Sequence, residues 1–444
     1  MTGEWELVPF EQLLFEPVRN GIYKPKEFHG RGVKIVNMGE LFAYPRLHSV
    51  SMKRVELNDS ELKRFMLSEG DLIFARRSLT AEGAGKCSVV LELDEPTTFE
   101  SSIIRARPDQ EKAVPLYLYY FFNSSSGLHS LDTIRRQVAV AGITGGDLAK
   151  LPIPVPPIPE QRAIAHILGT LDDKIELNRR MNETLETIAW AIFKSWFVDF
   201  DPVRAKMSGE APESICQRLG LTPDLLALFP DRFKDSELGE IPEGWNVTKV
   251  QEATSKIFSG GTPDTRKAEY WGGELNWCSS GETRNRFIVE TEKKITQLGV
   301  DNSSTKAVVP GDILIASAGQ GHTRGQTSYC AIDTFINQSV VSVRANTEKA
   351  KPLWLFYNLA SRYEEMRGLS DSHSSRGSLT TKLIGGMSLI FPPFKLVKAF
   401  DDITRPLAHK QIEGAQQSVT LSMIRDALLP KLLSGELRVP VNPE

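Results

Sequence analysis

The chain has 444 residues, 41% of them hydrophobic and 25% charged, which is enough apolar material for two or three folded domains. Its formal net charge is −3 and its isoelectric point about 6.2, which argues against a chain that binds nucleic acid by general basicity. Any such contact has to come from local clusters of cations or from a partner. No apolar run reaches the roughly 18 residues of a membrane span, the acidic N-terminus lacks the order of a secretory signal, and the four cysteines form no C-x-x-C pair. We therefore expect a cytoplasmic protein with reduced thiols.

The chain repeats itself once. Five short motifs recur in the same order, about 236 to 241 residues apart, and an ordered series of this kind indicates a duplication. The matched motifs are Trp5 with Trp245, Gly70-Asp71-Leu72-Ile73 with Gly311-Asp312-Ile313-Leu314, Thr98–Arg107 with Thr334–Arg344, Pro115-Leu116-Tyr117 with Pro352-Leu353-Trp354, and Pro156-Pro157 with Pro392-Pro393.

Each half shows the same order of expected elements. Short alternating segments rich in Val, Ile and Phe, such as KCSVVLEL and SVVSVR, predict strands of a mixed sheet. A short helix is expected after each Pro-Leu-aromatic triplet. A proline-rich hinge then opens a long helix, because proline costs little at the first helical position. Residues 201–240, with several Pro and Gly residues and one short helical piece, are expected to be a semi-ordered connector.

The two long helices carry apolar or small residues in steps of three and four, which predicts coiled-coil seams that are polar in the middle. Asn178 and Asn182 are expected to meet the Gly414–Gln417 region in an antiparallel pair, although the same pattern also fits one face of an ordinary domain core. A helix of about 35 to 40 residues is about 50–60 Å long. This is longer than one turn of B-DNA, which is roughly 34–36 Å. The expected seam residues are Ile164, Leu168, Leu171, Ile175, Asn178, Asn182, Leu185, Ala189, Ile192 and Trp196, and Phe400, Ile403, Leu407, Lys410, Gly414, Gln417, Leu421, Ile424 and Leu428.

Four segments resemble one family. The run LPIPVPPIPEQRAIAHILGTLDDKIELNRRMNETLETIAWAIFKSWF is similar to the central conserved region of type I restriction–modification specificity (S) subunits. The segments LIFPPFKLVKAF and LLPKLLSGELRV resemble their distal conserved region, and SGGTPDTRKAEYWGGELNW resembles the start of a target-recognition domain. The resemblance covers nearly the whole chain in the expected order.

The resemblance implies an α+β chain with two similar target-recognition domains, each of mixed sheet and helices, separated by two long antiparallel coiled-coil helices. The domains would each read one half of a bipartite site in double-stranded DNA. The helices would dock two methyltransferase (M) subunits, joined by restriction/translocase (R) subunits for cleavage. The chain would then be no enzyme by itself, and S-adenosylmethionine, Mg and ATP would bind to the partner subunits. The expected plan is recognition domain 1 at 1–155, a central helix at 156–200, a connector at 201–240, recognition domain 2 at 241–392 and a distal helix at 393–440.

Catalytic alternatives have weaker support in the sequence. Asp264, Glu292 and Lys294 fit the loose P-D…E-x-K pattern of Mg-dependent nucleases, in which acidic groups hold the metal and a lysine positions water. Gly83 to Lys86 fail the phosphate-loop pattern, and the histidines show no metal-ligand spacing. A self-contained nuclease and a protein-only scaffold remain as alternatives to a DNA reader.

Polar loops after the two Gly-Asp strands, and basic segments near the start of each half, are the candidate DNA contacts. Arg and Lys suit guanine and phosphate, and Gln suits adenine. For any single residue, a solvated loop is an equally good interpretation. The candidates are Tyr23, Lys24, Arg31, Arg76, Arg77, Lys86, Thr262, Arg266, Lys267, Arg284, Arg286, Gln320, Arg324, Gln326 and Arg376.

Overall fold

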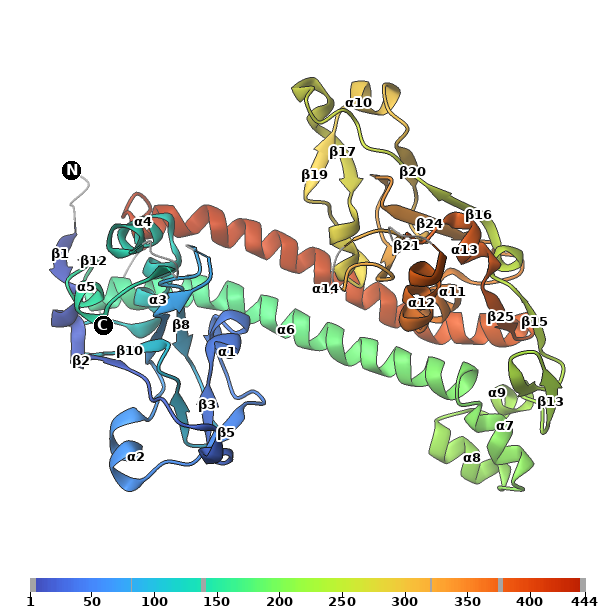
Figure 1. The fold of residues 1–444 in the computed structure, drawn as a ribbon, viewed down its shortest axis with the longest axis horizontal. Helices are drawn as coiled ribbons and strands as arrows, with labels where there is room; N and C mark the ends of the chain where they lie inside the picture. Colours follow the sequence, from blue (N-terminus) through green and yellow to red (C-terminus); the bar gives the residue numbers. More distant parts are fainter. Residues whose placement is uncertain (1–4, 81, 137–140, 320–321, 374–377, 440–444) are drawn as a thin grey trace. The chain divides into compact units, whose positions relative to one another are not determined.

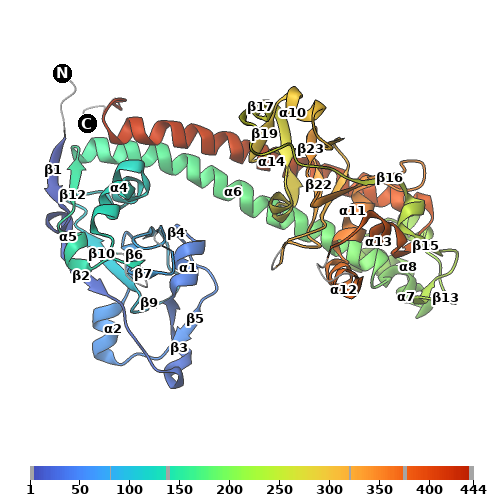
Figure 2. The ribbon, with the colours of Figure 1, turned by 45° about the horizontal axis from the view of Figure 1, so that its top comes forward.

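A computed structural model describes residues 5–80, 82–136, 141–319, 322–373 and 378–439. The chain is α+β and divides into two compact units, residues 1–175 with 420–444 and residues 176–419. Figures 1 and 2 show the elements of both units. The unit boundaries fall inside two 40-residue helices, α6 (Ile158–Phe197) and α14 (Phe394–Leu433), so each unit contains part of both helices.

The first unit is built on a five-stranded sheet of order β2-β10-β6-β8-β4. Its pairs are antiparallel except β4 with β8. A three-stranded sheet of order β5-β3-β9 and two short antiparallel pairings, β1 with β12 and β7 with β11, complete it. The strands are β1 (Glu6–Pro9), β2 (Leu14–Asn20), β3 (His29–Val36), β4 (Arg46–Leu47), β5 (Lys53–Val55), β6 (Leu72–Ala75), β7 (Arg77–Ser78), β8 (Cys87–Val90), β9 (Thr97–Phe99), β10 (Ile103–Pro108), β11 (Ala141–Gly142) and β12 (Pro152–Val155).

The second unit repeats this plan. Its five-stranded sheet has the order β16-β24-β21-β22-β18, again with only the last pair parallel, and its second sheet has the order β19-β17-β23-β20. The duplication read from the sequence is therefore a duplication of fold, with β20 added. The strands are β15 (Asn246–Lys249), β16 (Thr254–Ser259), β17 (Trp271–Cys278), β18 (Phe287–Ile288), β19 (Lys293–Ile295), β20 (Lys306–Val308), β21 (Ile313–Ala316), β22 (Thr327–Cys330), β23 (Thr334–Ile336), β24 (Val340–Ala345) and β25 (Ser388–Phe391).

Short helices cover the sheets at matched places. Helices α3 and α11 begin at the prolines of the repeated Pro-Leu-aromatic motif, as predicted, and bury Tyr117 and Trp354 in the two main cores. The other short helices are α1 (Met38–Ala43), α2 (Asp59–Phe65), α3 (Pro115–Asn123), α4 (Ser125–Ile134), α5 (Gly145–Ala149), α10 (Gln297–Asp301), α11 (Pro352–Ala360), α12 (Tyr363–His373) and α13 (Thr381–Gly386).

Residues 201–240 contain more structure than the one helical piece predicted. They form α7 (Asp201–Met207), α8 (Pro212–Leu219), α9 (Pro223–Ala227) and a hairpin of β13 (Phe233–Ser236) with β14 (Gly239–Pro242). The prolines that suggested breaks stand in the first turn of all three helices, where proline is favourable. Val203, Ile215 and Phe229 are buried in the main core of the second unit, beside Trp245.

The long helices run antiparallel within each unit, as predicted. In the first unit Arg425 Nη1 donates to Asp172 Oδ1 at 2.7 Å. In the second, Asn178 Nδ2 donates to Gln417 Oε1 at 2.9 Å, and Asn182 Nδ2 donates to the Gln411 carbonyl at 3.0 Å. Residue numbers therefore rise along α6 as they fall along α14.

The seam differs from the prediction at two positions: Ile424, which is 43% exposed, and Lys410 in the middle. Lys410 is exposed and pairs with Glu413, whereas the neighbouring Gln411 is buried. An unperturbed helix turns every 3.6 residues, so a strict alternation of three and four steps drifts off the contact face. Gly414 is also buried, and a Cβ there would lie 2.9 Å from Asn182 Oδ1.

The space beside Gly414 is therefore too small for a bulky side chain. We expect Gly414→Leu to lower the stability of the chain by about 2 kcal/mol or more, because the added side chain overpacks the contact between the helices. Gly368→Leu is the matched control: Gly368 lies in α12, is exposed and has open space beside it, so higher helix propensity should leave stability unchanged or raise it by up to about 1 kcal/mol. Urea unfolding of both variants followed by circular dichroism measures the difference, and equal stabilities would contradict the packing described.

Candidate DNA interface

The repeated Gly-Asp motif forms a turn whose buried aspartate pairs with a half-buried arginine. Gly70 and Gly311 have φ of +84° and +98°, the left-handed region that favours glycine. Asp71 is fully buried; its Oδ1 accepts from Arg107 Nε at 2.7 Å, and its Oδ2 accepts from the backbone N–H of Ser68 at 2.8 Å.

The second unit has the same arrangement. The buried Asp312 accepts from Arg344 Nε at 2.7 Å and Nη2 at 2.6 Å, and from the backbone N–H of Val309 at 3.1 Å. We call these two pairs, Asp71–Arg107 and Asp312–Arg344, the strand clamps, because each ties the start of one strand (β6 or β21) to the end of its neighbour (β10 or β24).

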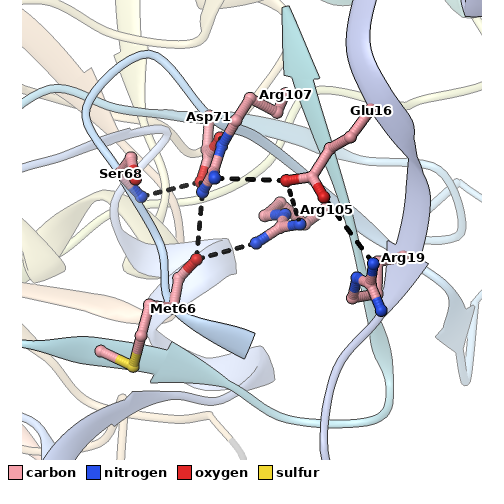
Figure 3. A network of polar contacts seen from close by, with 7 residues as sticks. All are labelled: Glu16, Arg19, Met66, Ser68, Asp71, Arg105 and Arg107. Atoms are coloured by element: carbon pink, nitrogen blue, oxygen red, sulfur yellow. Dashed lines mark hydrogen bonds and ion pairs between the residues drawn. The ribbon is translucent and has the colours of Figure 1, made fainter. Parts of the chain in front are cut away.

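The clamp of the first unit belongs to a larger network, shown in Figure 3. Arg105 is almost fully buried and donates to Glu16 Oε1 at 2.7 Å and to the Met66 carbonyl at 2.8 Å. Burial lowers the pKa of the Arg105 guanidinium, and the nearby carboxylates of Asp71 and Glu16 oppose that shift. The matched position in the second unit is Ser342, a neutral residue that is also buried.

Each clamped strand leads at its other end into the polar loop predicted to meet DNA. In both halves a glycine with positive φ closes this loop by donating back to the strand: Gly85 N to the Ala75 carbonyl at 2.8 Å, and Gly325 N to the Ala316 carbonyl at 2.9 Å. The loops therefore start from equally fixed bases.

A second loop joins the first in each unit. The backbone N–H of Ile143 donates to the Arg76 carbonyl at 3.0 Å, and that of Leu379 donates to the Ser317 carbonyl at 2.8 Å. The structure thus brings together two loops of each half, those that hold Arg76 and Ile143 in the first and those that hold Ser317 and Leu379 in the second. We call this pair of loops the loop site of each half.

The predicted residues of the loop sites differ from one another in exposure and in their contacts. Arg77 is exposed on β7, whereas Arg76 donates to the Ser101 carbonyl at 3.3 Å and Lys86 donates to the Phe42 carbonyl at 3.3 Å. Gln326 is half-buried at the position matching Lys86, and Arg324 pairs with Asp371. Gln320 and Arg376 lie outside the described residues.

The predicted residues near the start of the first half are mostly engaged with acids. Lys24 Nζ lies 2.7 Å from Glu61 Oε2 and over the Phe28 ring, and Arg31 Nη2 lies 2.8 Å from Glu56 Oε2. Tyr23 is largely exposed.

The predicted residues of the matched segment in the second half also have partners within that half. Arg266 Nη2 lies 2.9 Å from Asp264 Oδ2, Lys267 Nζ donates to the Tyr270 hydroxyl at 3.0 Å, and Thr262 donates to Gln338. These contacts order the segment, and Asp264 also partly neutralises the charge of Arg266.

Arg286 packs against the helix α6 and is held there by an ion pair. Its Nε lies 2.6 Å from Glu186 Oε1 on α6, and its guanidinium lies over the Trp190 and Phe356 rings at 5.6 and 5.0 Å from their centroids. Arg284, two residues earlier, is exposed and lies 2.5 Å from Glu292.

The nuclease alternative does not assemble a metal site. Asp264 pairs with Arg266, which lowers the pKa of its carboxyl to about 2, and Glu292 pairs with a different arginine, Arg284. Within the described part of the chain, no group of three or more His, Cys, Asp or Glu side chains could hold a metal ion. In the same residues, no helix is long and apolar enough to cross a membrane.

Residues 19–187 and 242–402 match the family described as type I restriction modification DNA specificity domain. The chain belongs to this family. The two matched stretches are the two halves of the duplication, so this DNA specificity chain carries the family domain twice. As a member of the specificity family it is the DNA-specificity component of a type I restriction–modification system and no catalytic subunit, so the nuclease alternative is not supported.

Similar proteins cover the chain along nearly its whole length. The HindI specificity subunit of Haemophilus influenzae is 26% identical, over 91% of this chain and 94% of its own length. The MjaIX specificity subunit of Methanocaldococcus jannaschii is 24% identical, over 94% of this chain and 89% of its own. The crystal structure of the S subunit from M. genitalium superposes with a TM-score of 0.60 at 16% identity, over 96% of each chain, which shows a shared fold.

The two strand clamps should differ in how much stability is lost when their arginine is replaced, because only the first has a second arginine, Arg105, beside its aspartate. We expect Arg344→Met to lower stability by about 3 kcal/mol or more, because it leaves Asp312 buried without its cation. Arg107→Met should cost less, because Arg105 stays near Asp71 and interacts with it electrostatically. Urea unfolding measures both losses. A loss for Arg107→Met as large as that for Arg344→Met would show that Arg105 does not compensate.

A separate expectation concerns Arg286. We expect Arg286→Ala to lower stability by about 1–3 kcal/mol, because it removes the packed stem and leaves Glu186 without its cation. Arg284→Ala, the exposed control, should stay within about 0.5 kcal/mol of the parent. Thermal unfolding measures both. An Arg286→Ala variant as stable as the parent would contradict the packing role and leave the predicted DNA contact as the alternative.

Proposed function

We propose that this chain recognises a bipartite sequence in double-stranded DNA, with each loop site reading one half. The observation that carries the proposal is that the two halves share a framework and differ in their loops. The clamps, the closing glycines and the order of the strands match between halves. The loop residues do not: Arg76 and Lys86 of the first half correspond to Ser317 and Gln326 of the second. Equal scaffolds with unequal loops suit two different half-sites.

The chemistry of the loops supports direct reading of bases. Arg77 and Lys86 are cations suited to guanine and to phosphate, whereas Gln326 presents an amide suited to adenine. Gln320, Arg324 and Arg376 are proposed to belong to the same loop site of the second half, and Tyr23, Lys24, Arg31, Thr262, Arg266, Lys267 and Arg284 to positions beside the DNA backbone.

We further propose that the chain works inside an assembly. A net charge of −3 gives little general attraction to DNA, so methyltransferase subunits docked on α6 and α14 would supply part of it. S-adenosylmethionine would bind to those subunits, and Mg and ATP to restriction subunits that join them, in the cytoplasm where the DNA target lies. The proposed plan is recognition domains at 1–155 and 241–392, helices at 156–200 and 393–440, and a connector at 201–240.

A domain exchange tests the proposal. We expect that replacing residues 1–155 by the same segment of a relative with another target changes one half of the methylated sequence and leaves the other half intact. Replacing residues 241–392 should change the other half. The measurement is the mapping of methylated bases in cells that express each hybrid with its methyltransferase. An unchanged target in both hybrids would favour a protein-only scaffold.

A further inference from the structure

The small sheets of the two units match residue by residue at their edges. In the first unit β5 lies at the edge of the order β5-β3-β9, and in the second β19 lies at the edge of β19-β17-β23-β20. The same irregularity occurs in both: Val55 faces both His29 and Val33, and Ile295 faces both Trp271 and Leu275.

Glycines accommodate this irregularity in both halves: Gly30 and Gly272 are matched and have positive φ, whereas Gly32 and Gly273 differ by one position. A Cβ at Gly32 would lie 2.4 Å from the Val55 carbonyl oxygen, and one at Gly273 would lie 2.5 Å from that of Ile295. The register is therefore fixed in each half, and it makes Lys53 of β5 the counterpart of Lys293 of β19. Lys53 faces Ile35, and Lys293 faces Trp277.

Both lysines are exposed, and neither forms an ion pair with any carboxylate of the described residues. Among the described residues, the one contact of either ammonium group is that of Lys293, whose Nζ lies 5.7 Å from the centroid of the Trp271 ring. The adjacent Arg54, by contrast, pairs with Glu95 at 2.7 Å.

Because they have no carboxylate partner, the two lysines differ from most of the cations that the sequence predicted to contact DNA. Lys24, Arg31, Arg266 and Arg284 each pair with a carboxylate of their own half. A paired cation has to give up its carboxylate before it can bind a phosphate, whereas an unpaired one exchanges only water and counterions. In a chain of net charge −3, unpaired cations at matched positions are the groups best suited to the DNA backbone.

We propose that Lys53 and Lys293 each contact a DNA phosphate and so position the two halves on the duplex without reading its sequence. The inference rests on the proposed function, and it adds a backbone contact on the small sheet to the base-reading loop sites. Because the framework is duplicated, each lysine would lie at the same place relative to the DNA of its own half-site. Phosphate contacts fix register and carry no base information.

Edge lysines have another use that the experiment has to separate. Charged residues on an edge strand prevent two sheets from pairing edge to edge. In that case loss of the charge would promote self-association and leave DNA binding unchanged.

The experiment uses the full chain assembled with its methyltransferase subunits and two duplexes, one with the mapped target and one of unrelated sequence. Fluorescence anisotropy gives the affinity for each duplex over a series of KCl concentrations. For Lys53→Gln and Lys293→Gln we expect the slope of log affinity against log salt to fall in magnitude by about 0.9 each, and by about 1.8 in the double variant. The change should be the same on both duplexes, and the methylated sequence should stay the same.

Two controls complete the design. Lys53→Arg and Lys293→Arg keep the charge and should keep the slope, and Lys234→Gln, an exposed lysine of the β13–β14 hairpin, should change nothing. Unchanged slopes in the Gln variants, with or without self-association on size-exclusion chromatography, would overturn the phosphate contact. A changed methylated sequence would overturn it too, since it would assign the lysines to base reading. If the parent assembly bound neither duplex, the proposed function itself would fail.

Discussion

A buried carboxylate inside a sheet needs a cation, and this requirement organises both halves of the chain. Asp71 and Asp312 each cap a turn and accept two hydrogen bonds from an arginine on the neighbouring strand. Leaving such a charge unpaired costs about 3–5 kcal/mol, so neither partner can be exchanged freely. The clamped strand then carries a loop at its other end, where exposed side chains can change at little cost in stability. Fixed bases with variable loops are what a reader of different sequences requires.

The contacts with the long helix α6 have diverged between the halves. The matched residues Tyr120 and Tyr357 both donate a hydroxyl hydrogen bond to a carboxylate of α6, but the acceptors are Asp172 and Glu186, which are not matched by the duplication. Burial raises the pKa of both hydroxyls, so both remain protonated donors. The duplication therefore preserved the need for an acceptor and not its position. An arginine adds to the attachment in each unit: Arg46 pairs with Asp173 of α6 in the first, and Arg286 pairs with the same Glu186 in the second.

Much of this architecture was predictable because it repeats along the sequence. Motifs about 236 to 241 residues apart revealed two equal folds, and steps of three and four residues revealed the contact faces of the two long helices. Ion pairing was not predictable, because it joins residues far apart in the chain: Arg286 and Glu186 are 100 positions apart, and Asp71 and Arg107 are 36. For the same reason the sequence could not separate paired cations such as Arg31 from unpaired ones such as Lys53. The signal for the clamps was present, since Arg107 and Arg344 end matched motifs.

The central claim is that two clamped frameworks present two different loop sites to one DNA molecule. The most direct measurement is the mapping of methylated bases across the genome of cells that express this chain with its methyltransferase, compared with cells that lack the chain. The account predicts one modified sequence made of two unlike specified halves with unspecified bases between them. A single uninterrupted target, two identical halves, or methylation that does not depend on the chain would contradict it.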